Sequence, residues 1–370
     1  MDSLLIYGSY GYTGRLIARE AVSRGGSPVV AGRDGRAVTR QADELGVEGR
    51  TFDLSDDVGA QLRSFDAVLN CAGPFVKTVD PLVEACLETE TDYLDITGEF
   101  QVFERLRQRD AAARDAEITL LPGVGFDVVP SDCLAAFLHD QLPSATDLSL
   151  GIKSRGPLSR GTAKTLVENF GGDGVVRRNG RLIKVPAAFR TRDIDFGDGP
   201  EHAVTIPWGD VVTAAHSTGI DSVEVYAAAP PWATRAMGFA DSLGWVLERR
   251  PVERAFKRLI DARIDGPDER ERSRGSATVW GEVIDESTGR RARARLRTPN
   301  PYALTAEAAV SAAERAVDGR GRNRIPTGFQ TPSSAFGSEF ATELSGTERE
   351  VLEVPAELDE PEQSALESDD

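Results

Sequence analysis

The sequence predicts an α/β fold, with a doubly wound parallel sheet in the first part of the chain and a second domain of the α+β class after it. Two observations carry this prediction. Between residues 4 and 125, short apolar segments alternate with segments of helical periodicity, the order expected of a parallel sheet with crossover helices. From Leu148 onward the pattern changes to strands separated by turns rich in glycine and proline. We therefore expect a first domain over residues 1–140 and a second over 141–301.

A glycine-rich turn follows the first apolar segment directly. Residues 4–7 run into three glycines in the spacing Gly-x-x-Gly-x-x-Gly, and a helical segment follows. Glycine adopts backbone angles that other residues avoid, and it lets a phosphate approach the bare amides at the start of a helix. This indicates a Rossmann-type dinucleotide-binding turn, and an ordinary βα turn without a ligand is the alternative. We expect its two tyrosines to cover the cofactor. The turn comprises Gly8, Ser9, Tyr10, Gly11, Tyr12, Thr13 and Gly14.

The residue at the end of the second expected strand, 28–33, indicates which dinucleotide binds. An acidic side chain there would take the ribose hydroxyls of NAD, whereas Arg33 can pair with the 2′-phosphate of NADP. NADP(H) is therefore the expected cofactor, and a solvated turn arginine is the alternative. The third strand, near 50–52, ends at Asp53, whose carboxylate either faces the adenine edge or caps a helix that begins near Asp56.

The remaining strands of the first sheet are expected to end beside the first three. The fourth, 67–71, stops at Ala72, Gly73 and Pro74, where the nicotinamide half of the cofactor can lie against the backbone. The fifth and sixth strands are expected at 93–99 and 118–123. In a doubly wound sheet the carboxyl ends of the strands share one edge, and ligands bind there. We expect that edge to hold Gly8, Arg33, Asp53, Gly73, Gly98 and Gly125.

In the second domain the clearest expectation is a β-hairpin. Residues 277–284 and 291–297 alternate like strands, and 286–289 form the turn between them; further strands are expected at 148–152 and 221–226. Because side chains alternate along a strand, the second hairpin strand places four arginines on one face. In an acidic chain we expect them to meet carboxylates, and binding of an anionic group on the substrate is the alternative. The four are Arg291, Arg293, Arg295 and Arg297.

Helical stripes are expected at 239–247 and 252–260, with a last helix at 303–317. The paired stripes indicate a lid or a homodimer surface, and a lipid-contacting surface is the alternative. Trp245 lies off the stripe, and its exposure would favour an apolar partner. Residues 353–370 carry eight acidic and no basic side chains, which predicts a solvated tail.

Composition excludes several classes of protein. The 370 residues carry a formal net charge of −17, which repels phosphate backbones and anionic membranes, so we expect no nucleic-acid partner. Only five of the 43 basic residues are lysine, and abundant carboxylates with few lysines suit a high-salt cytoplasm, which leads to the hypothesis of a halophilic protein. Three irregularly spaced cysteines predict neither a disulfide framework nor a metal site. We see no leader and no apolar run that could span a bilayer, and expect a cytoplasmic protein that is soluble or at most membrane-peripheral.

Seven segments in order carry a resemblance to a known family: 8–14, 31–33, 93–99, 122–132, 160–162, 207–210 and 329–332. Together they make most of the chain similar to the saccharopine dehydrogenase-like oxidoreductases, and within these to the branch named for trans-acting enoyl reductases. The resemblance implies an NADP-binding Rossmann domain, a central mixed domain, and a C-terminal segment, 302–345, that returns to the first domain. It does not imply saccharopine as the substrate.

The enoyl reductase branch implies hydride delivery from NADPH to an activated carbon–carbon double bond, while a side chain protonates the neighbouring carbon. His216 lies in a stretch that looks like a family motif and can titrate near neutrality, and a structural histidine is the alternative. Asp127 can act as the acid if it is buried beside the cofactor, or it caps the helix that begins at Pro130.

Two functions therefore compete. The first is an NADPH-dependent oxidoreductase that reduces an enoyl, imine or carbonyl group of a small or lipid-like substrate between the two domains. The second is a non-catalytic NADP(H)-binding scaffold or sensor, which the scarcity of acid–base residues supports, since the chain has only three histidines.

Overall fold

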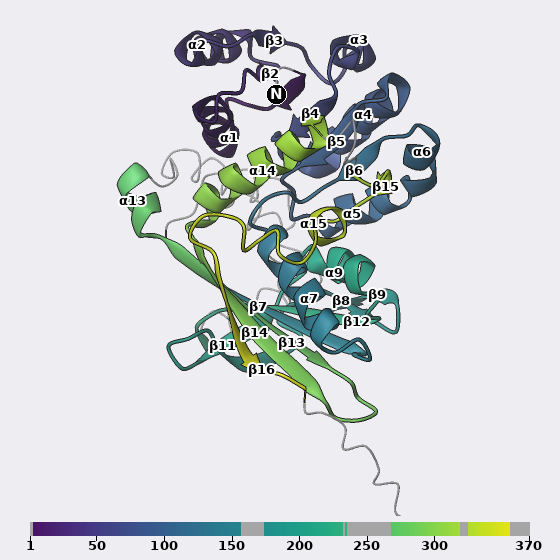
Figure 1. Ribbon diagram of the computed structural model, residues 1–370, viewed down its shortest axis with the longest axis vertical. Helices are drawn as coiled ribbons and strands as arrows, with labels where there is room; N and C mark the ends of the chain where they lie inside the picture. Colours follow the sequence, from purple (N-terminus) through teal and green to yellow (C-terminus); the bar gives the residue numbers. More distant parts are fainter. Residues whose placement is uncertain (1–2, 157–173, 232–233, 235–267, 319–324, 356–370) are drawn as a thin grey trace, which may run out of the picture.

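The computed structural model describes residues 3–156, 174–231, 234, 268–318 and 325–355. Within these ranges the chain forms a seven-stranded sheet and a nine-stranded sheet. Figure 1 shows the two sheets at opposite ends of the long axis of the molecule. The predicted architecture, an α/β domain with a second α+β domain, is confirmed.

The first sheet is parallel throughout and has the order β15-β6-β5-β4-β1-β2-β3. Because β1 lies inside the sheet and the chain winds outward from it in both directions, the sheet is doubly wound. Its register sets Tyr7 beside Asn70 and Asn70 beside Asp95, so the carboxyl ends of the strands share one edge. The strands are β1 (Leu4–Tyr7), β2 (Val29–Gly32), β3 (Gly49–Thr51), β4 (Ala67–Asn70), β5 (Asp92–Asp95), β6 (Thr119–Leu121) and β15 (Gly328–Phe329).

Helices connect these strands and cover both faces of the sheet. Every residue of β1, β2 and β4 is buried, and their near-continuous apolar runs are what a strand covered on both faces requires. The helices of this domain are α1 (Tyr12–Ser23), α2 (Gly35–Leu45), α3 (Val58–Leu62), α4 (Phe75–Thr89), α5 (Phe100–Arg107) and α6 (Asp110–Asp115).

The fifth strand is shorter than the sequence suggests. We expected it over 93–99, but β5 ends at Asp95. The Asp95 carboxylate accepts a hydrogen bond from the Thr97 backbone nitrogen at 3.0 Å, and its backbone carbonyl accepts one from Val124 at 2.8 Å. An aspartate that binds the amide two residues ahead turns the chain out of the sheet, which local β-propensity alone does not reveal.

The second sheet has the order β10-β11-β12-β7-β13-β14-β16, and β8 joins it between β12 and β9. Helices α7 (Val129–Gln141) and α9 (Asp210–Thr218) pack against it. The expected hairpin is present as β13 and β14, paired antiparallel. The strands are β7 (Asp147–Arg155), β8 (Gly174–Arg178), β9 (Arg181–Val185), β10 (Thr191–Asp195), β11 (Pro200–Thr205), β12 (Ser222–Ala228), β13 (Ser276–Ile284), β14 (Arg291–Pro299) and β16 (Glu348–Glu353).

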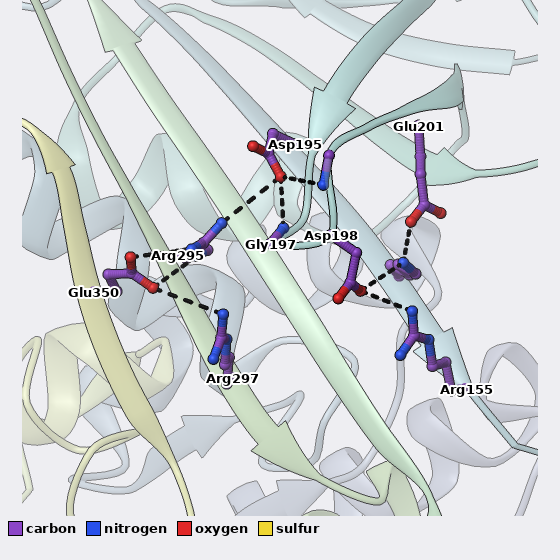
Figure 2. A network of polar contacts seen from close by, with 10 residues as sticks. Arg155, Asp195, Gly197, Asp198, Glu201, Arg295, Arg297 and Glu350 are labelled. Carbon is purple, nitrogen blue, oxygen red and sulfur yellow. Dashed lines mark hydrogen bonds and ion pairs between the residues drawn. The ribbon is translucent and has the colours of Figure 1, made fainter.

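This sheet is strongly curved, so that its edge strand β10 lies over its face. A Cβ on Gly151 of β7 would lie 2.8 Å from the Cδ1 atom of Ile194 on β10, so β10 folds across the face of β7. Further along, Asp195 of β10 lies 3.8 Å from Arg295 of β14, although four strands separate β10 from β14 in the sheet order. Figure 2 shows the Arg295 side chain between Asp195 and Glu350.

Most of the arginines on β14 lie beside a carboxylate. Arg295 makes a two-bond pair with Glu350, at 2.9 and 3.0 Å. Arg293 pairs with Glu282 and with Glu353, and Arg297 lies 3.9 Å from Glu350. Arg291 is exposed. For three of the four arginines the expected carboxylate partners are therefore present, and these contacts do not favour the alternative of an anion site.

The C-terminal segment contacts both sheets. α14 (Pro301–Asp318) packs along α1, where Arg24 donates to Ser311 at 2.9 Å and to Glu314 at 3.1 Å. After it, β15 extends the first sheet beside β6, and α15 (Pro332–Phe336) follows. β16, which the sequence analysis did not anticipate, then pairs with β14 in the second sheet.

Several sequence predictions lie outside the described residues. These are the helical stripes at 239–247 and 252–260, Trp245, the segment 160–162 and most of the acidic segment 353–370. Among the helices of the described ranges, none combines the length and apolar character needed to cross a membrane.

Candidate functional site

Three glycines shape the turn between β1 and α1. Gly8 has a φ of +78°, and a Cβ on it would lie 2.7 Å from the backbone nitrogen of Ala72. A Cβ on Gly14 would lie 2.6 Å from the Gly8 carbonyl oxygen, and one on Gly11 would lie 3.3 Å from it. Side chains at Gly8 and Gly14 would force α1 away from the sheet edge. No side chain caps the first turn of α1, so its amides face a site that fits the pyrophosphate of a dinucleotide.

Two side chains of this turn support the fold rather than the phosphate site. Ser9 is buried, and its hydroxyl lies 2.8 Å from Gln41 Oε1. The Tyr10 ring covers Gly32 at the end of β2, where a Cβ would lie 2.4 Å from a ring carbon. The Tyr10 hydroxyl accepts a hydrogen bond from the Asp34 backbone nitrogen at 3.4 Å. Tyr10 therefore stands between the phosphate turn and the end of β2.

Arg33 and Asp34 differ in what they have to offer a ligand. Arg33 is exposed and makes no hydrogen bond or ion pair within the described part of the chain. The Asp34 carboxylate instead caps α2, where it accepts hydrogen bonds from Arg36 at 3.0 Å and Ala37 at 3.2 Å. A basic group is thus available at the end of β2, while the acidic group beside it is already engaged.

Asp53 does not cap the helix that follows it. Its carboxylate accepts two hydrogen bonds from Ser55, at 3.1 and 2.9 Å, and α3 is capped by Asp57 instead. The capping alternative for Asp53 is therefore wrong, because the turn at Ser55 delays the helix start to Val58. The bonds from Ser55, helped by the nearby charge of Arg33, lower the pKa of Asp53.

The segment 72–74 leads into α4, whose first turn is capped by a residue that follows the neighbouring strand. Glu99, in the loop after β5, accepts hydrogen bonds from Phe75 at 3.0 Å and Val76 at 3.1 Å. Sequence reasoning missed this role of Glu99. The available signal was an acidic residue after β5 and, at the start of α4, an N-cap residue, Pro74, whose side chain cannot accept a hydrogen bond.

A buried hydrogen-bond network joins the carboxyl ends of β4, β5 and β6. Asn70 donates to the Tyr93 hydroxyl at 3.1 Å, and this hydroxyl donates to Asp95 at 2.9 Å. Asp95 also accepts a hydrogen bond from Gly123 at 3.0 Å. Burial raises the pKa of Asp95 to about 6, although these bonds act in the opposite direction. The network fixes the three strand ends beneath the position expected for the nicotinamide.

Asp127 lies in the loop between β6 and α7 and faces Gly98. A Cβ on Gly98 would lie 3.0 Å from Asp127 Oδ2. The Asp127 carboxylate makes no hydrogen bond or ion pair with any described residue, and burial raises its pKa to about 6. The capping alternative for Asp127 is wrong, because the N-cap of α7 is Val128 and no side chain caps that helix.

Three of the segments that carry the family resemblance meet at α7 and α9. Asp132 accepts hydrogen bonds from the Ser217 hydroxyl at 2.5 Å and from the Ser333 backbone nitrogen at 2.8 Å. The Ser217 hydroxyl lies 2.6 Å from that of Thr331. In the same region Asp210, the first residue of α9, is fully buried and its two carboxyl oxygens have no hydrogen bond of good geometry. Burial raises the pKa of Asp210 well above its usual value.

The structure does not bring His216 to Asp127. His216 lies in the last turn of α9 and is exposed, with its ring edge-on to Phe329 of β15 at 4.9 Å between centroids. Desolvation of the ring lowers the pKa of His216. Asp127, in contrast, lies against Gly98 at the carboxyl edge of β5, nearer the glycine turn in the strand order.

A doubly wound sheet whose first βα turn forms a glycine cradle defines a dinucleotide-binding α/β protein. Residues 4–121 match the family model described as the saccharopine dehydrogenase NADP binding domain. The first domain of this chain is therefore similar to the NADP-binding domain of that family. The resemblance seen in the sequence is confirmed.

Curated relatives of the same kind are similar to part of this chain. A Mycobacterium tuberculosis protein named among the trans-acting enoyl reductases is 30% identical over 184 residues, covering 45% of this chain and 43% of that protein. The human saccharopine dehydrogenase-like oxidoreductase is 27% identical over 205 residues, covering 47% of each. The matched region therefore spans less than half the length of these relatives.

The fold likeness extends over nearly the whole chain. The apo saccharopine dehydrogenase (L-Glu forming) of Saccharomyces cerevisiae superposes with a TM-score of 0.65, covering 95% of this chain and 100% of that one. The two are 11% identical in sequence, so the likeness concerns the fold alone.

Proposed function

We propose that this protein is an NADPH-dependent oxidoreductase that reduces an enoyl, imine or carbonyl group of a small or lipid-like substrate. In this proposal residues 1–140 and 302–345 bind the cofactor, residues 141–301 hold the substrate, and the reaction takes place between them. The observation that carries it is the Asp127 carboxyl, which lies at the carboxyl edge of the NADP-binding sheet with no hydrogen-bond partner among the described residues and a pKa of about 6.

The choice of NADPH over NADH rests on Arg33. Its exposed guanidinium follows β2, where the 2′-phosphate of the adenosine ribose is expected, and it forms charge-assisted hydrogen bonds with such a group. The neighbouring Asp34 uses its Oδ1 atom to cap α2, which leaves one carboxylate oxygen for the ribose hydroxyls. This combination favours the phosphorylated cofactor.

Bound NADPH supplies the hydride. Asp127 supplies the proton: its carboxyl O–H bond breaks as the proton passes to the atom next to the one that receives the hydride, and the aspartate becomes ionised. A pKa near 6 leaves part of the carboxyl protonated at neutral pH and makes it a better acid than an ordinary alcohol or water. We place His216 outside this step, since its ring packs against the edge strand β15.

We also infer a reducing, salt-rich cytoplasmic setting. Cys86 and Cys133 are buried and Cys71 is partly buried, and none of the three forms a disulfide. The net charge of −17 would be compensated by high ionic strength.

A cofactor titration tests the first half of the proposal. Fluorescence titrations with NADPH and NADH should give tighter binding of NADPH, and Arg33→Ala should weaken NADPH binding by roughly ten- to a hundredfold while leaving NADH unchanged. Arg40→Ala removes an exposed arginine further along α2 and serves as the control. Equal loss of both dinucleotides in Arg33→Ala would contradict the assignment.

NADPH consumption with a panel of enoyl, imine and carbonyl compounds tests the second half. Asp127→Asn should lower the rate by roughly 10²- to 10⁴-fold without changing NADPH affinity, and His216→Gln should leave it within about twofold. Tight NADPH binding with no consumption on any class of substrate would favour the non-catalytic NADP(H)-binding scaffold instead.

A further inference from the structure

Tyr12, the first residue of α1, contacts two elements that lie far from it in the sequence. Its hydroxyl lies 3.2 Å from Nη1 of Arg272, on α13 (Glu269–Arg274). Its ring packs edge-on against Tyr302, at the start of α14, with 5.1 Å between ring centroids. α13 directly precedes β13 of the second sheet. A guanidinium from the second half of the chain thus stands at the start of the phosphate-binding helix.

Arg272 places a positive charge where the pyrophosphate of the cofactor is expected. The turn from Gly8 to Gly14 contains no basic residue, so within it backbone amides, the helix dipole and the Thr13 hydroxyl are what can offset the two charges of a pyrophosphate. The chain as a whole carries a net charge of −17, which disfavours an anionic ligand. A guanidinium with several donors in a fixed plane is well suited to bridge two phosphate groups.

The contacts around Arg272 orient it toward Tyr12. Asp268 caps α13 and exchanges hydrogen bonds with Glu271, at 2.8 and 2.9 Å, which holds the Glu271 carboxylate at the helix start. Arg270 and Arg274 on the same short helix are exposed, whereas Arg272 is partly buried. Within α13, therefore, Arg272 is the arginine directed at the start of α1.

We propose that Arg272 binds the pyrophosphate of the dinucleotide and so completes the cofactor site from the second half of the chain. The inference rests on the NADP-binding first domain and extends it. The hydroxyl of Tyr12, whose ring packs against Tyr302, positions the guanidinium before the cofactor arrives, which reduces the entropy lost on binding.

The test compares three ligands by fluorescence titration or by competition against NADPH. NADPH and NADH both contain the pyrophosphate, whereas adenosine 2′-monophosphate carries the 2′-phosphate alone. Arg272→Gln should weaken NADPH and NADH by the same factor, roughly ten- to a hundredfold, and leave adenosine 2′-monophosphate unchanged. Arg33→Ala should show the complementary pattern: weaker binding of NADPH and of adenosine 2′-monophosphate, and unchanged binding of NADH.

Two further variants serve as controls. Arg270→Gln removes the same charge from the same helix and should leave all three affinities unchanged. Arg272→Lys keeps the charge but not the planar donor group and should give an intermediate loss. The proposal is overturned if Arg272→Gln leaves the three affinities as unchanged as Arg270→Gln does. It is also overturned if Arg272→Gln lowers the affinity for adenosine 2′-monophosphate as much as the affinity for NADPH. If the parent protein binds none of the three ligands, the proposed function fails first.

Discussion

The indole Nε1 of Trp208 lies 2.7 Å from the backbone carbonyl oxygen of Asp127 and donates a hydrogen bond to it. Trp208 comes from the segment before α9, and Asp127 from the loop before α7. The bond therefore joins two segments that the sequence separates by about eighty residues. It fixes the backbone of Asp127 while its carboxyl stays without a hydrogen bond to any described residue.

Asp127→Asn should stabilise the protein at alkaline pH. Burial raises the pKa of Asp127 from 3.8 to about 6, so the folded state holds this proton more tightly than the unfolded chain does. The resulting stabilisation is complete below about pH 4 and is lost as the pH rises through 6. Asparagine has nearly the same shape and no ionised form. At pH 8 the variant should gain roughly 1–3 kcal/mol in free energy of unfolding, measured by urea denaturation, and the gain should vanish near pH 4.

Asp53→Asn provides the control of opposite sign. Hydrogen bonds from Ser55 lower the pKa of Asp53, so this exposed carboxylate stabilises the fold above its pKa, and its replacement should not increase stability at pH 8. If Asp127→Asn also gains nothing at pH 8, the Asp127 carboxyl is well solvated and loses its case as the proton donor.

Gly14→Ala should damage both the fold and the cofactor site. The added Cβ would lie 2.6 Å from the Gly8 carbonyl oxygen and 2.8 Å from that of Ser9, and both are backbone atoms that cannot move aside alone. We expect a loss of roughly 2–4 kcal/mol in free energy of unfolding together with weaker NADPH binding. Gly35→Ala at the start of α2 is the control, because its Cβ would meet only the Thr51 side chain, at 3.4 Å. Unchanged stability in Gly14→Ala would mean that α1 packs less closely than described.

Arg295 and Arg297 should contribute unequally to stability, although both lie on the same face of β14. The Arg295 side chain is 11% exposed and makes a two-bond pair with Glu350, whereas the Arg297 side chain is 55% exposed and lies 3.9 Å from the same carboxylate (Figure 2). Arg295→Gln should therefore lower the free energy of unfolding by roughly 1–3 kcal/mol, and Arg297→Gln should lower it by less than about 0.5 kcal/mol. Chemical denaturation of both variants decides this, and equal losses would contradict the two-bond pair between Arg295 and Glu350.

Thermal stability should rise with salt. Screening by added KCl shortens the range of charge repulsion from about 10 Å at 0.1 M to about 3 Å at 1 M, which favours the compact state of a chain with a net charge of −17. Calorimetry from 0.1 to 2 M KCl should give a steadily increasing Tm. A constant or falling Tm would count against a halophilic protein.

Much of the fold could be predicted because local patterns and the global fold agree in the first domain. The apolar segment at 4–7, the glycine spacing that follows it and the repeated alternation of strand and helix leave few topologies open. The same patterns located Arg33 at the end of β2 and the segment 72–74 at the end of β4.

The site was harder to predict, because its residues act through partners distant in the chain. Glu99 caps α4 from the loop after β5, and the pKa of Asp210 is raised because the fold buries it near other carboxyl groups. β16 was missed because an edge strand with exposed charges has no distinctive apolar pattern.

By itself, the sequence determined the doubly wound sheet, the glycine cradle and the place of a basic residue directly after β2, because each depends on residues adjacent in the chain. Only the tertiary structure decided the rest. It separated Asp127 from His216, it paired the β14 arginines with carboxylates, and it brought Arg272 to Tyr12. The physical reason is that a carboxyl's proton affinity and a guanidinium's partner depend on burial and on neighbours within a few ångströms, and those neighbours come from segments that only folding brings together.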